Sequence, residues 1–228
     1  MKMLSIDASG KTAAVAVTDG NTLLAQSFTD SGLTHSQTLL PMVDSTLKLA
    51  GVDISEIDEF ALTAGPGSFT GLRIGASLVM GLANGRLCRP VSTLSALSYN
   101  LVHDKCIIIP VMDARRSQVY TAVFESDGKQ LTRLMPDAPL SVDEVTDRIR
   151  GYCGEKQVRI LGDGAYLFEN AVSTLENAGF PEGKLVYTQG ISIALAAAEA
   201  APVRAADIKL EYLRMSQAER ELKERKNK

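Results

Sequence analysis

Tryptophan is absent from this 228-residue chain, and histidine and cysteine are scarce: it has two histidines, His35 and His103, and three cysteines, Cys88, Cys106 and Cys153. The cysteines are too few and too widely spaced for a disulfide framework or a zinc site, so we expect reduced thiols, with Cys106 packed in a core. No apolar run approaches the roughly 20 residues that would cross a bilayer. These absences argue against secreted disulfide-rich, zinc-binding and membrane-spanning proteins, and they predict a cytoplasmic one.

The chain also lacks an excess of positive charge. Its formal net charge is -3, whereas proteins that grip phosphate backbones on their own rely on clustered Lys and Arg. We therefore expect any RNA to be contacted only through a partner protein. The one basic concentration runs from residue 214 to the charged tail, 216–228, where Glu alternates with Lys and Arg. Such a mixture is typical of a solvated helix or a frayed end.

Hydrophobic residues make up 45% of the chain, enough to bury a large core in one or two domains. The first half reads as three short strands, a helix, a buried strand and a second helix. Asp19-Gly20-Asn21 between two alternating runs is a hairpin signal, and Gly51 closes the first helix. The expected elements are strands at 3–7, 12–18, 22–28 and 60–64, and helices at about 36–50 and 69–85.

The same order begins again at Cys106, and Ser141 with Glu144 three residues later is a capping box. The duplicated β-β-β-α-β-α plan is that of the actin-like ATPase (ASKHA), ribonuclease-H-like and sugar-kinase folds. We therefore predict an α/β protein with two such lobes, residues 1–103 and 104–228, and a hinge near 102–106. The expected elements of the second half are strands at 106–112, 118–124, 130–135, 158–161 and 185–187, and helices at 142–152, 165–178 and 191–200.

Each half ends its first strand in an aspartate followed by alanine: Asp7-Ala8-Ser9 and Asp113-Ala114-Arg115. In nucleotide-handling proteins of this fold class, aspartates at these places face each other across a cleft and organise a metal-bound phosphate. Alternatively, both side chains accept backbone N–H bonds in the turns that follow, as Asp does readily. The residues leave both interpretations open.

A glycine-rich loop, Gly65-Pro66-Gly67-Ser68, joins a buried strand to the second helix. Small residues there allow the N–H groups of a helix start to approach an anion. However, the string lacks the lysine of a phosphate loop and the G-x-G-x-x-G spacing, so it also reads as a tight turn. We expect no metal and no firmly held cofactor. A vestigial site for weak ATP or ADP binding would use Asp7, Ser9, Gly65, Gly67 and Ser68.

The stretch from Gly65 to Gly75, GPGSFTGLRIG, resembles a motif of the bacterial TsaB (YeaZ) family. The resemblance extends over nearly the whole chain. It implies the actin-like fold and a part in the machinery that installs threonylcarbamoyl on N6 of adenosine 37, in tRNAs that read codons beginning with A. The further matching segments are IDAS at 6–9, HSQTLLP at 35–41, PVSTL at 90–94, DAR at 113–115 and YLR at 212–214.

The resemblance also implies partners and a division of labour. In that family's system a paralogue, TsaD, performs the transfer, an ATPase, TsaE, joins, and a separate synthase supplies threonylcarbamoyl-adenylate. TsaD-type proteins carry a His-x3-His pair, which on a helix can clamp one metal ion. Here those two places fall at Thr93 and Leu97, and neither side chain is a metal ligand. We therefore predict a non-catalytic subunit.

Two other classes are weighed against that prediction. No Ser-His-Asp spacing and no G-x-S-x-G elbow supports a peptidase, and the missing histidines disfavour a metallopeptidase. A free-standing ATPase or small-molecule kinase of the same fold is the alternative. Binding of ATP with magnesium by the purified protein would distinguish it from a scaffold subunit.

A subunit without chemistry acts through contact, and the second helix carries small and apolar residues at three- and four-residue intervals. Small residues permit close packing, either on the chain's own sheet or on a partner helix. The family resemblance implies pairing with TsaD, or with a second copy when alone, through the helices at 36–50 and 71–85. The predicted interface residues are His35, Leu39, Val43, Gly71, Gly75, Leu78, Val79 and Leu82.

Overall fold

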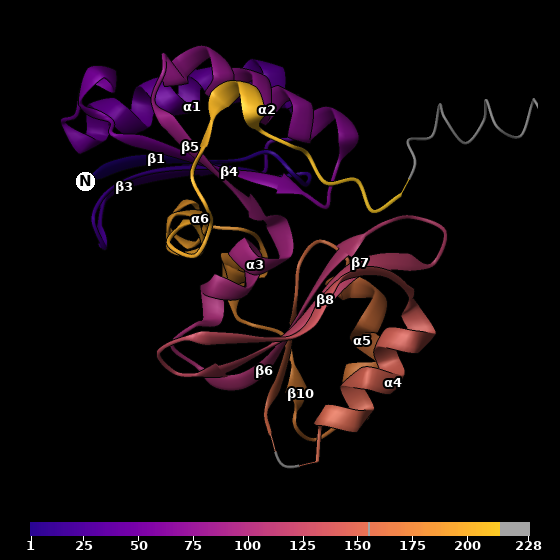
Figure 1. The fold of residues 1–228 in the computed structure, drawn as a ribbon. Coiled ribbons are helices and arrows are strands. Elements are labelled where there is room, and N and C mark those ends of the chain that lie inside the picture. Colours follow the sequence, from indigo (N-terminus) through magenta and orange to yellow (C-terminus); the bar gives the residue numbers. More distant parts are fainter. Residues whose placement is uncertain (155, 215–228) are drawn as a thin grey trace, which may run out of the picture.

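The computed structural model describes residues 1–154 and 156–214, which form two lobes, each built on one β-sheet (Figure 1). The predicted charged tail at 216–228 lies outside the described residues. The strands are β1 (Lys2–Asp7), β2 (Ala13–Asp19), β3 (Thr22–Thr29), β4 (Glu59–Gly65), β5 (Leu87–Ser92), β6 (Lys105–Asp113), β7 (Gln118–Asp127), β8 (Leu131–Ser141), β9 (Val158–Leu161), β10 (Ala178–Gly179) and β11 (Val203–Arg204). The α-helices are α1 (His35–Ala50), α2 (Phe69–Ala83), α3 (Thr93–Ser98), α4 (Val142–Tyr152), α5 (Glu169–Val172) and α6 (Gly190–Ala197).

The first lobe is a mixed six-stranded sheet in the order β11-β5-β4-β1-β2-β3. Helices α1 and α2 cover one face, where Leu4 and Ile6 of β1 enter the main core. Helix α6 covers the other face, where the Ser5 hydroxyl donates to the Gly190 carbonyl at 2.7 Å. Because β1 is covered on both sides, its residues from Met3 onward are buried, and it reads as a nearly continuous apolar run.

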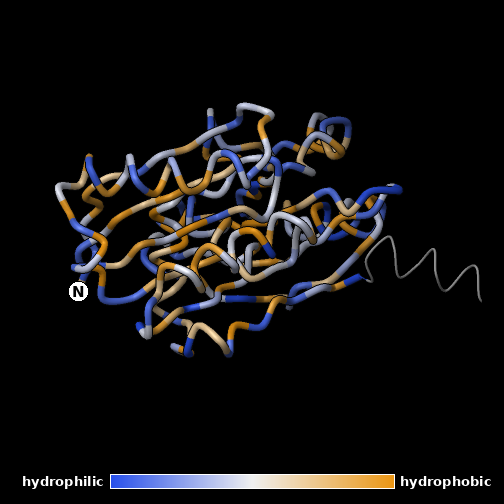
Figure 2. Tube along the Cα trace, turned by 90° about the horizontal axis from the view of Figure 1, so that it is seen from above, coloured by the Kyte–Doolittle hydropathy of each residue, from blue (hydrophilic) through white to orange (hydrophobic). Residues whose placement is uncertain are grey.

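The second lobe is a five-stranded sheet in the order β10-β9-β6-β7-β8. β6 pairs antiparallel with β7 and parallel with β9. One face of this sheet packs on α4 and on the turn that holds Phe168, and the other face packs on α3. In Figure 2 the hydrophobic stretches run along the strands through the middle of the molecule, while many of the surrounding turns are hydrophilic.

The predicted order of elements is confirmed for both lobes up to β9, with close boundaries except at β8, which continues to Ser141 although the prediction ended at 135. The elements β5, α3, β10 and β11 were not predicted. The helix expected at 165–178 is instead a 3-10 turn at Ala165–Phe168 followed by the four-residue α5, and the strand expected at 185–187 is a 3-10 turn at Gly183–Val186. The buried apolar side chains of this segment, Ala165 and Phe168, lie in the first turn after β9, while Val172, the last residue of α5, and Leu175 beyond it are only partly buried against the core.

The end of the chain departs from the predicted division into 1–103 and 104–228. Helix α6 packs on the first sheet, and β11 pairs antiparallel with β5 at its edge. The second lobe is therefore inserted between two parts of the first. Among the described residues, no helix has both the length and the apolar content to cross a membrane.

Candidate functional site

A cleft of about 640 Å³ lies between the lobes. Its walls are the turns that follow β1, β4, β6 and β9, together with the end of the described chain. β1 and β4 run parallel to each other, as do β6 and β9. Ligands of open α/β sheets bind outside the carboxyl ends of such strands, so the topology makes this cleft the first place to look for chemistry.

Asp7 ends β1 and is buried. Its Oδ1 accepts hydrogen bonds from the Ser9 backbone N–H at 3.0 Å, the Ser9 hydroxyl at 2.6 Å and the Thr63 hydroxyl at 2.6 Å. Three donors on one oxygen tie this carboxylate to its own turn and to the neighbouring strand β4. The interpretation as a turn-forming aspartate therefore describes Asp7, although its side chain also lines the base of the cleft.

Asp113 stands on the opposite wall of the cleft and is exposed. Its Oδ1 accepts from the Arg115 backbone N–H at 2.6 Å, and its Oδ2 accepts from the Tyr166 hydroxyl at 3.1 Å. The interpretation as acceptors in local turns describes both aspartates, whereas they line different parts of the inter-lobe space: Asp7 the small pocket at its base and Asp113 the large cleft.

A third carboxylate in the cleft, Asp163, was not predicted. Its Oδ1 accepts from the Asp113 backbone N–H at 3.0 Å. Burial raises the pKa of Asp163 above its usual value, and the charges of Asp113 and Asp7 raise it further, while the Asp113 hydrogen bond and Lys11 act in the opposite direction. The signal in the sequence was Gly162-Asp163-Gly164 directly after a buried strand.

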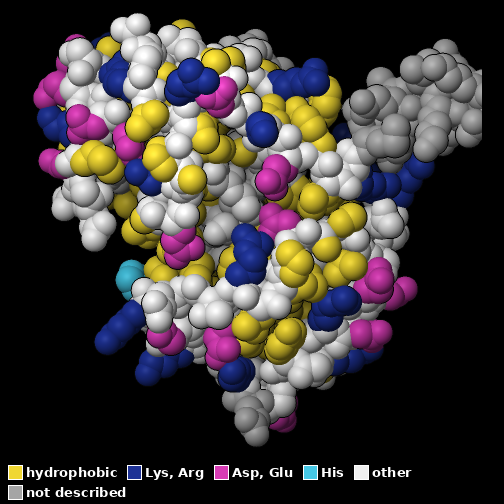
Figure 3. All heavy atoms as spheres, in the orientation of Figure 1, with side chains coloured by type: hydrophobic (Ala, Val, Ile, Leu, Met, Phe, Trp, Pro, Cys, Tyr) yellow, Lys and Arg dark blue, Asp and Glu magenta, His cyan; other side chains and the backbone are white. Residues whose placement is uncertain are grey.

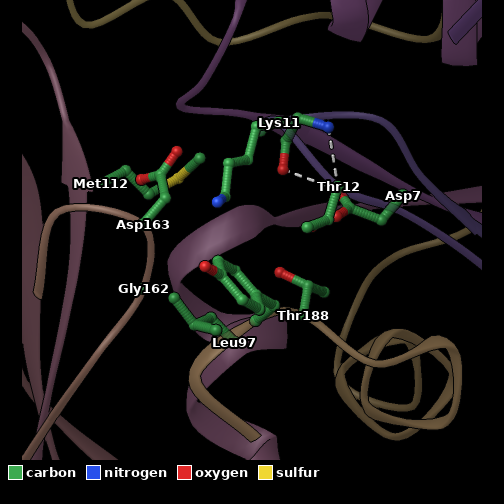
Figure 4. A pocket seen from close by; sticks show the side chains of 11 residues that line it. Asp7, Lys11, Thr12, Leu97, Met112, Gly162, Asp163 and Thr188 are labelled. Carbon is green, nitrogen blue, oxygen red and sulfur yellow. Dashed lines mark hydrogen bonds between the residues drawn. The ribbon is translucent and has the colours of Figure 1, made fainter. Parts of the chain in front are cut away.

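Lys11, also not predicted, extends from the turn after β1 into the cleft, toward the loop of Gly162 and Asp163 (Figure 4). The interaction with Tyr187 raises the pKa of Lys11, and the carboxylates of Asp30 and Asp163 add to the rise. At the base of the cleft a pocket of about 20 Å³ is large enough for about one water molecule. The cleft is thus mixed in charge, with carboxylates from both lobes around one lysine.

The glycine-rich loop packs closely against the backbone of other chain segments. A Cβ on Gly65, whose φ is +124°, would lie 2.2 Å from the Glu211 carbonyl oxygen, and one on Gly67 would lie 2.5 Å from the Ser9 carbonyl oxygen. The Ser68 N–H donates to that same Ser9 carbonyl at 2.7 Å, and the Ser68 hydroxyl caps α2 by accepting from Gly71 N–H at 3.3 Å. The small residues therefore bring chain segments together, and part of the amide set that an anion would need is already bonded.

The residues from β11 to the end of the described chain, 203–214, form what we call the C-terminal strap. The strap begins at the edge of the first sheet, and Glu211 N–H donates to the Ala64 carbonyl at 2.7 Å. The Tyr212 ring lies 4.8 Å from the Phe69 ring, and the Arg214 guanidinium donates to the Ala114 carbonyl of the second lobe at 2.8 Å. The strap thus covers the glycine-rich loop and closes one side of the cleft.

Most of the predicted interface residues belong to the core of the first lobe. Leu39, Val43 and Val79 are 1%, 2% and 0% exposed. The prediction is therefore wrong for these three as surface contacts, because their stripe on each helix faces the chain's own sheet. The helical spacing identified an apolar stripe, but spacing alone does not distinguish a stripe that faces the core from one that faces a partner.

The other five predicted interface residues are also engaged inside the chain. Leu78 and Leu82 are half-buried against the main core. Gly75 is buried beside Ala8, and a Cβ on Gly71 would lie 2.0 Å from the Ala8 carbonyl oxygen. The His35 Nε2 is 2.9 Å from the Gly10 carbonyl oxygen, which links the start of α1 to the turn after β1.

Comparison with known proteins places the chain in a family. A family model described as "TsaD: tRNA N6-adenosine threonylcarbamoyltransferase" matches residues 29–209. The TsaB protein of Bacillus subtilis is 30% identical over 184 residues, 79% of each chain. This chain belongs to the TsaB family. The TsaB protein of Escherichia coli, also named as a tRNA threonylcarbamoyladenosine biosynthesis protein, is 31% identical over 160 residues, 68% of this chain and 69% of that one.

The fold agrees with the TsaB assignment. A solved Pseudomonas aeruginosa protein described as similar to peptidase YeaZ superposes with a TM-score of 0.79 at 24% identity, covering 93% of this chain and 99% of that one. The predicted α/β fold of the actin-like ATPase class is confirmed.

The two places where TsaD-type proteins are expected to carry a metal-binding histidine pair, Thr93 and Leu97, lie on α3 and are buried. The Thr93 hydroxyl has no hydrogen-bond partner among the described residues. Within residues 1–154 and 156–214, no group of three or more His, Cys, Asp or Glu side chains is placed to hold a metal ion.

Proposed function

We propose that this protein is a non-catalytic subunit of the complex that transfers threonylcarbamoyl to N6 of adenosine 37 in tRNA. It binds and supports a TsaD-type catalytic paralogue, together with a TsaE-type ATPase, in the cytoplasm. Membership of the TsaB family supports the pathway, since curated relatives are named for it. The assignment of a non-catalytic role to this subunit is supported by the residues of this chain.

The observation that carries the proposal is the identity of the side chains on α3. At the two helical places expected to hold metal-binding imidazoles, this chain has a buried threonine and a buried leucine, Thr93 and Leu97. Leu97 offers no lone pair, and a threonine hydroxyl is a far weaker ligand than imidazole. A protein with this α3 would support a reaction by binding its partner rather than by activating the substrate.

The partner surface that we propose is the outer face of α1 and α2. On these helices Leu40 is 54% and Met80 is 48% exposed, and Ser77 and Gly81 lie on the same exposed side of α2. Large apolar side chains gathered on adjacent helices are characteristic of an interface. Small residues beside them would allow a partner helix to approach closely.

Replacing Leu40 and Met80 with aspartate should weaken binding of the TsaD-type paralogue by about tenfold or more, because two charges would have to be desolvated at the interface. The double variant should fold normally, since both side chains are exposed. Isothermal titration of the purified paralogue measures the effect. Leu134→Asp is the matched control, because Leu134 is 43% exposed on β8 of the other lobe. Equal affinity of wild type and double variant would exclude this face.

The substitutions Val79→Glu and Gly75→Arg do not test the same surface. Val79 is 0% exposed in the core, and Gly75 is buried against Ala8. A charge at either place would unfold the first lobe, and loss of binding would then say nothing about the interface.

The decisive experiment is threonylcarbamoyl transfer to tRNA with purified paralogue, ATPase and synthase, run with and without this chain. A non-catalytic subunit predicts activity that requires this chain and disappears when the paralogue is left out. Modification by this chain without the paralogue would make it a catalyst. Modification that proceeds equally well without this chain would remove it from the reaction.

The cleft between the lobes supports a second candidate, a free-standing ATP-binding enzyme of the same fold. Its volume of about 640 Å³ is within the usual range of small-molecule sites. Against that candidate, one oxygen of Asp7 already accepts three hydrogen bonds and Gly65 is covered by the strap. Titration with ATP and magnesium distinguishes the two: micromolar binding that Lys11→Ala abolishes would favour the enzyme.

A further inference from the structure

Four arginines lie along one rim of the cleft, on three segments that are distant in sequence. Arg73 is on α2, Arg214 ends the strap, and Arg115 and Arg116 form the turn between β6 and β7. The Arg73 Nε donates to the Tyr212 hydroxyl at 3.3 Å, and the Arg214 guanidinium donates to the Ala114 carbonyl at 2.8 Å. These contacts join the three segments into one surface, which we call the arginine ridge.

The ridge is a local concentration of positively charged side chains. Some arginines elsewhere pair with carboxylates, as Arg89 does with Glu59 and Arg204 with Asp207, and others, such as Arg86, donate to backbone carbonyls. None of the four ridge arginines forms an ion pair within the part of the chain that the structure describes. Figure 3 shows Lys and Arg side chains gathered at the right-hand edge, where the strap reaches the second lobe. In a protein of net charge -3, such a local concentration requires an explanation.

The turn that presents two of the arginines has an unusual backbone. Arg115, Arg116 and Ser117 have φ values of +62°, +56° and +54°. Side chains other than glycine are disfavoured in this left-handed region, and three in succession are rarer still. Such strain concentrates at functional sites. Both arginines of this turn are exposed to solvent.

Aromatic rings accompany the charge. The Tyr212 side chain is 39% exposed and lies against Phe69, and the Arg73 guanidinium is 3.8 Å from the centre of the Phe69 ring. Arginine and aromatic planes side by side are the groups on which unstacked RNA bases stack. Planar guanidinium groups also bind phosphate in a bidentate manner. An acidic protein surface would also use the charges, so an acidic polymer is the competitor that tests this alternative.

We propose that the arginine ridge binds tRNA directly, with Arg115, Arg116 and Arg214 on phosphates and the Arg73-Tyr212 pair beside an unpaired base. This replaces the expectation that tRNA is contacted only through a partner. The proposal rests on the proposed function for its choice of RNA, and it adds a binding surface that lies apart from the outer residues of α1 and α2.

The test is fluorescence anisotropy of the isolated full-length chain with a labelled, unmodified tRNA transcript, measured from 50 to 200 mM salt. Wild type should bind, and the logarithm of its affinity should fall linearly with the logarithm of salt concentration. Arg115→Gln combined with Arg116→Gln should lower the steepness of that line by about two, one for each phosphate contact. The double lysine variant at these positions should retain the steepness, since it retains the charge.

The matched control is Arg148→Gln with Arg150→Gln, which changes the net charge equally in the last turns of α4, whose first residue, Val142, donates to the Ser117 carbonyl of the ridge turn. It should leave affinity and salt dependence unchanged. Absence of binding by wild type at 50 mM salt, or equal losses in both double variants, would overturn the proposal. Poly-glutamate competing as well as tRNA would assign the ridge to an acidic protein instead. If the ridge binds tRNA but threonylcarbamoyl transfer proceeds equally well without this chain, the proposed function is refuted and the binding surface is retained.

Discussion

Gly71 shows how closely the segments around the cleft are packed. It lies in the first turn of α2, directly against the backbone of Ala8. Farther along the same helix, a Cβ on Gly81 would meet no atom of the described residues within 4 Å. Gly71 is therefore required because a neighbouring backbone leaves no room for a side chain, whereas the space beside Gly81 would accept one.

Gly71→Ala should destabilise the protein by roughly 1–3 kcal/mol, because the added methyl group overlaps the Ala8 carbonyl and α2 must move. Gly81→Ala should stabilise it by about 0.5–1 kcal/mol, the usual gain of alanine over glycine in an exposed helix. Urea denaturation of the two variants provides the comparison. A similar effect of the same sign at both positions would show that α2 is not held against β1 as described.

At the scale of elements, α2 is stabilised at its end by a side chain from the turn that precedes β5. The Arg86 guanidinium group donates to the carbonyls of Ala83 and Leu82, each at 2.8 Å, and to the Ile57 carbonyl at 3.0 Å. A cation at a helix C-terminus also interacts favourably with the helix dipole. Arg86 thus fastens α2 to the 3-10 turn that precedes β4.

Arg86→Gln should lower the free energy of unfolding by about 2–4 kcal/mol, since several carbonyls would lose a charged donor in a half-buried place. Arg204→Gln serves as the control: its side chain is 80% exposed and pairs only with a neighbour on the surface. That change should cost no more than about 0.5 kcal/mol. Chemical denaturation measures both, and a small effect at Arg86 would contradict its role as a cap.

The elements that could be predicted are those with a local cause. β1, β2 and β4 are apolar runs, and Ser141 with Glu144 forms the expected capping box at the start of α4. The helix expected at 191–200 is α6, but its packing on the first lobe and the pairing of β11 could not be predicted, because they depend on contacts such as Ser5 with Gly190 that join distant parts of the chain. In the site, Asp7 and Asp113 were found because each ends a strand. Asp163 also follows a strand but was missed, and the arginine ridge depends on how the lobes meet.

At the scale of the whole molecule, the lobes are joined at several places around the cleft. The Ser92 hydroxyl at the end of β5 donates to Asp137 of β8 at 2.5 Å, and the strap reaches Ala114 from the other side. The carboxylates of both lobes face the cleft between these links. The proximity of Asp163 to Asp7 therefore depends on the lobes staying together, whereas Asp113 lies on the same lobe as Asp163.

This arrangement predicts how stability depends on pH. The pKa of Asp163 is raised in the folded state, so the native protein binds this proton more strongly than the unfolded chain does. Ionisation of Asp163 therefore costs stability as the pH rises above its ordinary value of 3.8. Asp163→Asn should raise the melting temperature at pH 7, while keeping an oxygen for the Asp113 N–H. The gain should vanish near pH 3, where both states are protonated. Equal gains at both pH values would point to another cause.

The insertion of the second lobe into the first has a consequence for synthesis. A ribosome makes β1 to α2 early, but the helix that covers the inner face of the first sheet begins only at Gly190, and the strand at its edge only at Val203. Domains fold as they emerge, so the second lobe can close while the first still exposes one apolar face. Until the last described residues have left the ribosome, the nascent chain therefore presents an open sheet face on which chaperones could bind.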